Sequence, residues 1–309
     1  MKISDYLRLF LLAAIWGASF LFMRIVAPAL GAIPTAFFRV LLGALGLAAI
    51  LAMLRTQWHF NGKFERTMAL GVINSGIPFL MYSIAATLLP AGYSAIFNAT
   101  TPLMGVLIGY LFFQEQLNIK KFVGVAAGIA GVAFLTATGP IVLDVSVALG
   151  ALACLVATAC YGIAGFLAKR WITETGGLDA KLVAFGSQVG AAIFLVPCIG
   201  GAAMLGRLPA WGNENVWWAM AALGLVCTAW AYILYFRLIA DIGPVRSLTV
   251  TFLIPPFGVL WGKLFLDEQV TLAHLVGGGL IGAALWLVLS QPNTTALPAP
   301  RTGTGTTTS

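Results

Sequence analysis

The segment PLMGVLIGYLFFQEQ, at residues 102–116, returns as PPFGVLWGKLFLDEQ at residues 255–269, an offset of 255 − 102 = 153 positions. The proline, both glycines and the Glu-Gln pair that ends the apolar run all recur at this single offset. Shared Leu or Val carries little weight in so apolar a chain, but Pro, Gly and Glu at one constant spacing do. The chain therefore contains an internal duplication.

The repeat extends to both sides of this segment. Nearer the N-terminus the offset becomes slightly smaller, and Trp16-Gly17 faces Tyr161-Gly162. The wider set of matches pairs residues 69–71 with 222–224, Tyr82 with Tyr235, Ser94 with Ser247, Gly124 with Gly277, Arg24 with Lys169 and, less closely, Arg39 with Gln188. These matches predict a first repeat at 1–145, a second at 146–290, and a disordered tail rich in Thr, Pro and Gly at 291–309.

Composition indicates what surrounds the folded chain. Hydrophobic residues make up 60% of it and charged residues 9%, whereas a soluble domain carries about 25% charged residues. So few charges cannot cover a water-facing surface, and an all-α membrane protein in contact with the lipid bilayer is predicted. The net charge of +7 comes from basic residues in short gaps between apolar runs. That distribution is typical of membrane topology signals and indicates no nucleic-acid partner.

A helix needs roughly 20 apolar residues to cross the hydrocarbon core. Cutting the chain at charges, prolines and turn residues predicts ten spans, at 8–28, 33–54, 67–88, 92–113, 121–139, 148–168, 182–204, 215–238, 245–266 and 271–290. Five spans per repeat is an odd number, so the second repeat should enter the membrane inverted relative to the first. Inverted repeats around a central cavity are the architecture of alternating-access transporters.

The positions of the basic residues predict the orientation. If the N-terminus is internal, the outer loops contain few basic residues other than Arg207. The internal segments contain the basic residues Lys2, Arg8, Arg55, Lys63, Arg66, Lys120, Lys121, Lys169, Arg170, Lys181, Arg237, Arg246 and Arg301. This bias predicts that both termini are cytoplasmic in a multi-pass protein of the plasma membrane, which is the inner membrane in a bacterium.

The chain resembles the EamA family of the drug/metabolite transporter superfamily over nearly its whole length. The resemblance rests on residues 16–20 (WGASF), Arg39, the run 102–115 with Gly124 and Gly128, and its recurrence at 255–268 and Gly277. It implies ten helices, a central cavity between the halves, and export of small metabolites such as amino acids and their derivatives. Lys263 departs from its repeat partner Tyr110; it marks a substrate preference or pairs with Asp267.

Polar residues inside a span are costly unless they are paired or face a cavity. Ser94, Asn98 and Thr101 recur at i, i+4 and i+7, which places them on one helix face, and Ser247 and Thr251 hold the equivalent places in the second repeat. Both stripes are predicted to face the central site; interhelical hydrogen bonding is the alternative. Aromatic residues are predicted to complete the substrate-binding wall: Trp16, Tyr82, Tyr161 and Trp230. For Tyr235 a place in the interfacial belt is favoured.

Four further charged residues receive structural or coupling roles. For Arg39, structural anchoring near the interface is favoured over substrate contact, although a buried guanidinium needs an acceptor. Glu115 and Glu268 end matching helices and are interpreted as structural junctions, with proton coupling as the weaker alternative; Lys263 completes the group. The glycine spacings 105/109, 258/262 and 124/128 predict close helix packing, with Gly105 and Gly258 at matched contact points.

No catalytic constellation, cofactor motif or metal-ligand cluster is recognisable in the sequence. Gly277-x-Gly279-x-x-Gly282 formally matches a dinucleotide fingerprint, but it lies inside an apolar span without a preceding strand. The predicted function is therefore a secondary exporter of small polar metabolites and not an enzyme. Uptake or exchange of a vitamin or nucleotide-like solute is the alternative, and an intramembrane enzyme the alternative from another class. Substrate, direction, coupling ion and oligomeric state, monomer or homodimer, stay open.

Overall fold

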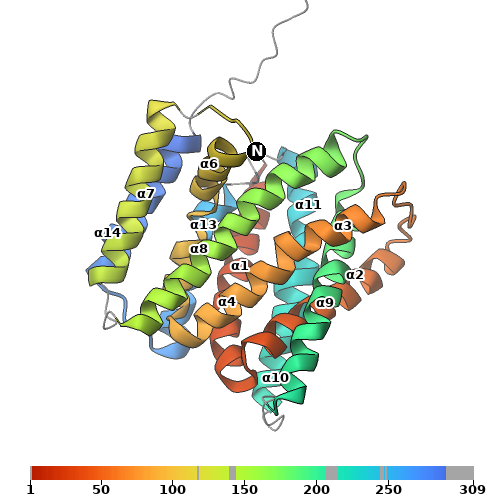
Figure 1. Cartoon of the computed structure of the whole chain (residues 1–309), viewed down its shortest axis with the longest axis horizontal. Coiled ribbons are helices and arrows are strands. Elements are labelled where there is room, and N and C mark those ends of the chain that lie inside the picture. Colours follow the sequence, from red (N-terminus) through yellow and green to blue (C-terminus); the bar gives the residue numbers. More distant parts are fainter. Residues whose placement is uncertain are drawn as a thin grey trace, which may run out of the picture.

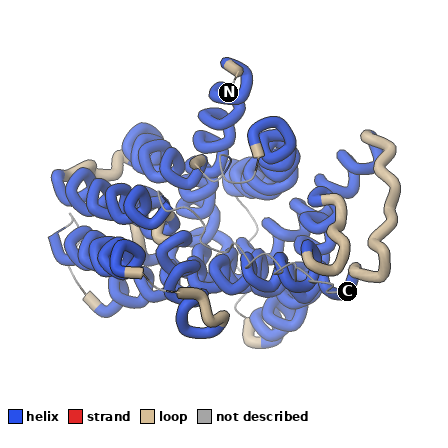
Figure 2. The backbone as a smooth tube through the Cα atoms, turned by 90° about the horizontal axis from the view of Figure 1, so that it is seen from above, coloured by secondary structure: helices blue, strands red, loops and turns tan. Residues whose placement is uncertain are grey.

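The computed structural model describes residues 2–116, 118–138, 144–206, 214–243, 247 and 249–289, and these contain helices, turns and loops but no strand (Figure 2). The elements of the first half are α1 (Ile3–Leu30), α2 (Ala32–Met53), α3 (Phe64–Gly71), η1 (Val72–Gly76), α4 (Ile77–Leu88), α5 (Ala91–Asn98), α6 (Thr101–Phe112) and α7 (Ile119–Thr138). Those of the second half are α8 (Val145–Ala168), η2 (Lys169–Thr173), α9 (Ala180–Met204), α10 (Glu214–Ala221), η3 (Ala222–Trp230), α11 (Ala231–Ile242), α13 (Val250–Leu266) and α14 (Leu272–Leu289). The η segments are π-helical turns within longer helices.

Each predicted span overlaps one of these helices or a run of consecutive ones. Residues 139, 245, 246, 248 and 290 of the predicted spans, and the tail predicted at 291–309, lie outside the described residues. Seven helical runs are long and apolar enough to cross a membrane, and α5 with α6 forms an eighth candidate that is bent by 42°. The helices α13 and α14 are apolar but fall among the shorter ones. The all-α membrane fold is thus confirmed, whereas the count of ten spans and the inverted relation of the halves stay predictions.

Helix packing follows the repeat. Helix α1 of the first half packs on α13 of the second half. Their repeat counterparts, α8 of the second half and α6 of the first, pack on each other in the same way. The contacts of α4 with α8 and of α1 with α11 form another matching pair, while α2 meets its own counterpart α9. The counterparts α7 and α14 lie side by side along one edge of the bundle (Figure 1). Each of these contacts therefore has an equivalent in which every helix is replaced by its counterpart from the other half.

Matched glycines mark one pair of equivalent crossings between the halves. A Cβ added to Gly17 would lie 2.7 Å from Phe257 Cβ and 3.0 Å from Gly258 N, and one added to Gly162 would lie 3.1 Å from Gly105 Cα. The Cβ direction of Gly258 is blocked by Ala95, whereas that of Gly105 meets open space. Gly105 thus lies at a contact point between the halves, as predicted, but at that crossing it is the missing Cβ of Gly162 that permits the approach.

The segment that follows each of these crossings has the same conformation. Gln114 and Asp267 adopt left-handed backbone conformations, with φ of 57° and 52°. The next residue, Glu115 or Glu268, donates its backbone N–H to a glycine carbonyl, Gly109 at 3.0 Å or Gly262 at 3.2 Å.

The Glu268 carboxylate makes a further contact with the other half of the chain. It accepts hydrogen bonds from the backbone N–H groups of Ala91 at 2.7 Å and Gly92 at 3.2 Å, in the first turn of α5. A helix N-terminus leaves such N–H groups unpaired and carries a partial positive charge. The Glu268 carboxylate therefore caps the N-terminus of α5.

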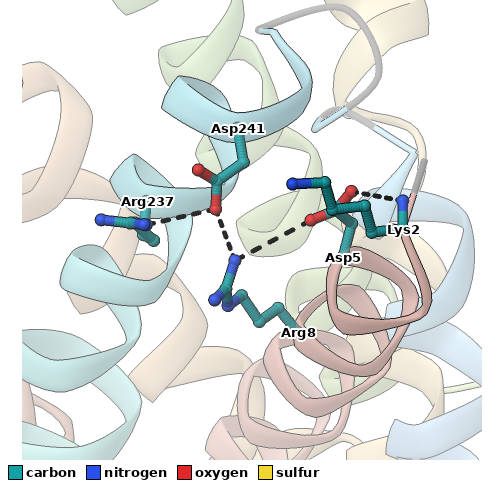
Figure 3. Close-up of polar contacts among 5 residues, drawn as sticks. All are labelled: Lys2, Asp5, Arg8, Arg237 and Asp241. Atoms are coloured by element: carbon teal, nitrogen blue, oxygen red, sulfur yellow. Dashed lines mark hydrogen bonds and ion pairs between the residues drawn. The ribbon is translucent and has the colours of Figure 1, made fainter.

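An ionic network joins the N-terminal end of α1 to the C-terminal end of α11 (Figure 3). Arg8 contacts Asp241 directly and Asp5 at 3.8 Å, and Arg237 Nε lies 3.2 Å from the same Asp241 carboxylate. Asp5 also accepts from the backbone N–H of Lys2 at 2.7 Å. Since Arg8, Arg237 and Asp241 are partly exposed, each pair with Asp241 contributes about 0–1 kcal/mol, but together these contacts fix which helix ends lie next to each other.

Candidate functional site

A cavity of about 430 Å³ lies between the two halves and is lined by both. Its walls come from α1 to α6 in the first half and from α8, α9, η3, α11 and α13 in the second. None of its described lining residues belongs to α7 or α14. The polar members are Ser19, Arg39, Asn74, Tyr82, Asn98, Thr101, Tyr161, Ser187, Thr228, Tyr232, Tyr235 and Thr251.

The cavity extends from the middle of the bundle towards one set of helix ends. Its lining includes Val183 in the first turn of α9, Thr251 in the first turn of α13 and Ala168 at the end of α8. Phe236 of α11 also lines it, close to the Asp241 end that pairs with Arg8. The cavity therefore extends towards the bundle end that carries the start of α1.

Arg39 is a buried cation in the cavity wall. It lies about two turns into α2 and is 5% exposed. Its Nε donates to Thr228 Oγ1 at 3.2 Å, its Nη1 lies 3.2 Å from Met23 Sδ, and its Cζ lies 3.7 Å from the centre of the Phe79 ring. Within the described part of the chain no carboxylate lies within ion-pairing distance of it. Its protein contacts are therefore a hydroxyl, a thioether and an aromatic face.

Gln188 of α9 makes the matching contact in the second half. Its Nε2 donates to Ser75 Oγ at 2.9 Å, and Ser75 and Thr228 are repeat partners because 228 − 75 = 153. Both hydroxyls lie in π-helical segments, η1 and η3, which often mark functional places in a helix. The halves therefore use the same hydrogen-bond frame, but one presents a cation and the other a neutral amide.

Aromatic rings make up much of the remaining wall. The Tyr82 ring stacks on Tyr161 at 6.3 Å between centroids and meets Phe20 edge-on at 5.4 Å, and Trp16 lies 5.2 Å from Tyr235. Such rings offer apolar surface together with hydroxyl groups that bind polar atoms. The cavity is thus suited to an amphipathic molecule.

The break between α5 and α6 places a polar pair at the same wall. Tyr82 donates its hydroxyl to Asn98 Oδ1 at 3.0 Å, and Thr101 Oγ1 donates to the Asn98 carbonyl at 2.7 Å. The 42° bend between α5 and α6 falls at residues 99–100. Hydroxyls that bond to carbonyls at such a bend satisfy groups that the interrupted helix leaves unpaired.

Of the predicted substrate-binding residues, Trp16, Tyr82, Asn98, Thr101, Tyr161 and Thr251 line the cavity, and Ser94, Ser247 and Trp230 do not. Ser94 is buried against α8, where Cys154 Sγ lies 3.9 Å from its Oγ, and Ser247 Oγ donates to the Gly243 carbonyl at 2.8 Å. Trp230 is 43% exposed on the outer surface of the bundle. Ser94 lies one turn before Asn98 on the same face of α5, at a level where that face packs on α8 and no longer lines the cavity. Trp230 is the last residue of the π segment η3, which shifts the side it faces from that of a regular helix.

The predicted charged residues also differ in whether they line the cavity. Arg39 lines the cavity, whereas Glu115, Glu268 and Lys263 lie outside its wall. Lys263 is exposed, and no ion pair with Asp267 occurs in the described structure. Tyr235 is part of the cavity wall and not of a belt. Its match with Tyr82 at the repeat offset was the signal that could have placed it there.

Comparison with known proteins agrees with this architecture. The model of the EamA-like transporter family matches the chain twice, at residues 4–137 and 148–290. The chain belongs to the EamA-like transporter family. It is therefore a multi-pass membrane transporter of the drug/metabolite transporter superfamily with two repeats, and a small-molecule substrate follows from that membership.

Individual relatives of this EamA transporter are distant. The chain is 21% identical to the uncharacterized transporter YoaV of Bacillus subtilis over 88% of its own length and 92% of the relative's. It is 24% identical to a probable terminal-alkyne amino-acid exporter of Streptantibioticus cattleyicolor, over 64% of each chain. A solved crystal structure aligns with a TM-score of 0.60 at 20% identity, over 93% of this chain and 96% of that one, and supports the fold.

Proposed function

We propose that this protein exports small amphipathic metabolites, amino acids and amino-acid-derived compounds among them, by alternating access. The observation that carries the proposal is the cavity between the halves, because both repeats line it with polar and aromatic side chains. A site at the interface of two repeats can be exposed to either side of the membrane when the repeats rock against each other.

The pairing of helices supports the alternating-access part. Each contact of α1 with α13 or α11 has a counterpart in α6 with α8 or α4 with α8. Halves that are inverted and exchange conformations would convert one set of contacts into the other. The cavity extends towards helix ends that the basic residues predict to be cytoplasmic, and we therefore infer an inward-facing state, from which an exporter loads its substrate.

The size and chemistry of the cavity support the substrate class. Ligand sites of about 300–1,000 Å³ enclose small molecules, and about 430 Å³ falls at the low end. The walls combine aromatic rings with Asn98, Asn74 and hydroxyl groups. One distant relative is named as a probable amino-acid exporter, which fits a solute of this size with both polar and apolar parts.

The test compares metabolites in the medium of cells that express the protein with those in cells that lack it. A set of small amphipathic compounds should accumulate outside only in expressing cells. Asn98→Leu, which fills the cavity, should abolish this accumulation, and Lys263→Gln, on the exposed surface, should leave it unchanged. Depletion of a compound from the medium by expressing cells would instead establish uptake, and identical media with normal protein levels would refute transport of this class.

A further inference from the structure

We propose that Arg39 binds the carboxylate of the transported molecule, so that the substrates are small monocarboxylates with an apolar or aromatic remainder. This inference rests on the proposed function and specifies the substrate class of the same cavity.

The first step concerns the state of Arg39 without a substrate. A charge taken out of water is costly unless it is paired, and buried ions in membrane spans generally mark a substrate or ion pathway. Arg39 is 5% exposed, yet its described hydrogen bonds go only to the hydroxyl of Thr228 and the thioether of Met23. Since a thioether is a weak acceptor, the protein itself leaves this cation incompletely paired.

The second step concerns orientation. The ring of Phe79 covers one face of the guanidinium, at 3.7 Å, and Thr228 holds the Nε edge. These contacts fix the plane of the group, while its Nη edge meets only Met23 among the described residues. A guanidinium held in this way is preorganised for two parallel hydrogen bonds to a carboxylate, a geometry that a lysine does not provide.

The third step concerns the number of charges. Among the described residues that line the cavity, Arg39 is the only one with a formal charge. The equivalent place in the second half holds Gln188, whose amide adds none. One negative charge is therefore matched, and a second carboxylate on the substrate would be buried without a partner. The aromatic wall around Tyr82 and Tyr161 then contacts the rest of the molecule, an apolar group or the ammonium of an amino acid.

The experiment compares each of a series of acids with its own amide, which has the same shape but no charge. The probes are 3-phenylpropanoate and 3-phenylpropanamide, together with straight-chain aliphatic acids and their amides. Thermal unfolding of the purified full-length protein is measured with each probe. We expect at least one acid to raise the unfolding temperature and bind about 10- to 100-fold more tightly than its amide, the range for a charge-assisted hydrogen bond.

Variants locate the effect. Arg39→Gln should remove the preference for the acid, whereas Arg24→Gln should retain it; Arg24 also lies in a span, but it donates to the Ala86 carbonyl and is not part of the cavity wall. Arg39→Lys should retain a weakened preference. If Arg39→Gln does not fold, the acid–amide comparison on the wild type and on Arg39→Lys still decides.

Equal binding of acid and amide, failure of every acid to bind, or an acid preference that Arg39→Gln keeps would overturn the inference. The proposed function is judged separately, by export measured in cells. Export restricted to compounds without a carboxylate would refute the role of Arg39 and leave the exporter intact. Acid binding through Arg39 without any export would refute the exporter proposal and leave the role of Arg39 intact.

Discussion

Arg39 of α2 and Gln188 of α9 donate equivalent hydrogen bonds to the opposite half of the protein, at 3.2 Å to Thr228 and at 2.9 Å to Ser75. The acceptors are repeat partners in equivalent π-helical segments. The frame around the cavity is thus shared by both halves, and the charge at its centre comes from one of them.

This relationship predicts different outcomes at the two hydroxyls. Thr228→Ala removes a hydrogen bond to a charged group, worth about 1.5–3 kcal/mol, and frees the guanidinium to rotate, so KM for transport should rise about tenfold or more. Ser75→Ala removes a neutral bond worth about 0.5–1.5 kcal/mol and should lower the unfolding temperature with little change in KM. Transport kinetics in proteoliposomes and thermal unfolding check both, and equal effects on KM would contradict the asymmetry.

The glycine crossings predict a second asymmetry. Gly258→Ala directs a methyl group against Ala95, and such overpacking should cost about 1–3 kcal/mol and reduce the yield of folded protein. Gly105→Ala meets open space and should be neutral or stabilise its helix by up to about 1 kcal/mol. Size-exclusion profiles and unfolding temperatures of the two variants are the measurement. Equal loss of folded protein in both would show that the spacing at Gly105 is also obligatory.

Cysteine accessibility tests which residues face the cavity. In a cysteine-free background, Asn98→Cys and Thr251→Cys should react with a water-soluble thiol reagent and be protected by a transported compound. Ser94→Cys and Ser247→Cys are the matched controls from the same predicted stripes and should stay unreactive, because both hydroxyls are buried away from the cavity. If Ser94→Cys reacts and a transported compound does not protect Asn98→Cys, the water-filled space lies on a different side of these helices from the assigned cavity.

Glu268 should matter for stability and not for coupling. Glu268→Gln removes the charge that caps α5 and should lower stability by about 0.5–2 kcal/mol, while the pH dependence of transport stays that of the wild type. Asp267→Asn, at the exposed neighbouring position, is the control and should change neither property. A transport rate that no longer responds to a proton gradient in Glu268→Gln alone would assign the coupling role to this carboxylate.

Topology is tested by reporter fusions. The basic residues predict that a reporter after Ser290 is cytoplasmic and that one within residues 137–147 is external. A C-terminal reporter found outside would refute both the even count of spans and the inverted relation of the repeats.

Much of the fold could be predicted because its signals lie in composition and in a fixed repeat spacing. Long apolar runs define helices whatever their neighbours are, and the match of residues 102–116 with 255–269 reveals the duplication. Within the site, Asn98 and Thr251 were found because a costly polar group in a span needs a reason to be there. Ser94 was misplaced because helix periodicity gives the face of a residue but not how far along that face the cavity extends. Trp230 was misplaced because it ends a π segment, which changes the side a residue faces and for which local sequence carries little signal. Arg39 could not be placed from sequence, since its partners Thr228, Met23 and Phe79 come from three different helices.

The crossings at Gly17–Gly258 and Gly105–Gly162 join one half of the chain to the other. The unit that was duplicated in the history of this protein is therefore not the unit that folds. A single half would leave its glycine faces uncovered in the lipid, with no partner of the right shape except the missing half. Two fragments separated between α7 and α8 should accordingly be degraded when each is produced alone, and should be rescued as an active pair when they are made in the same cell.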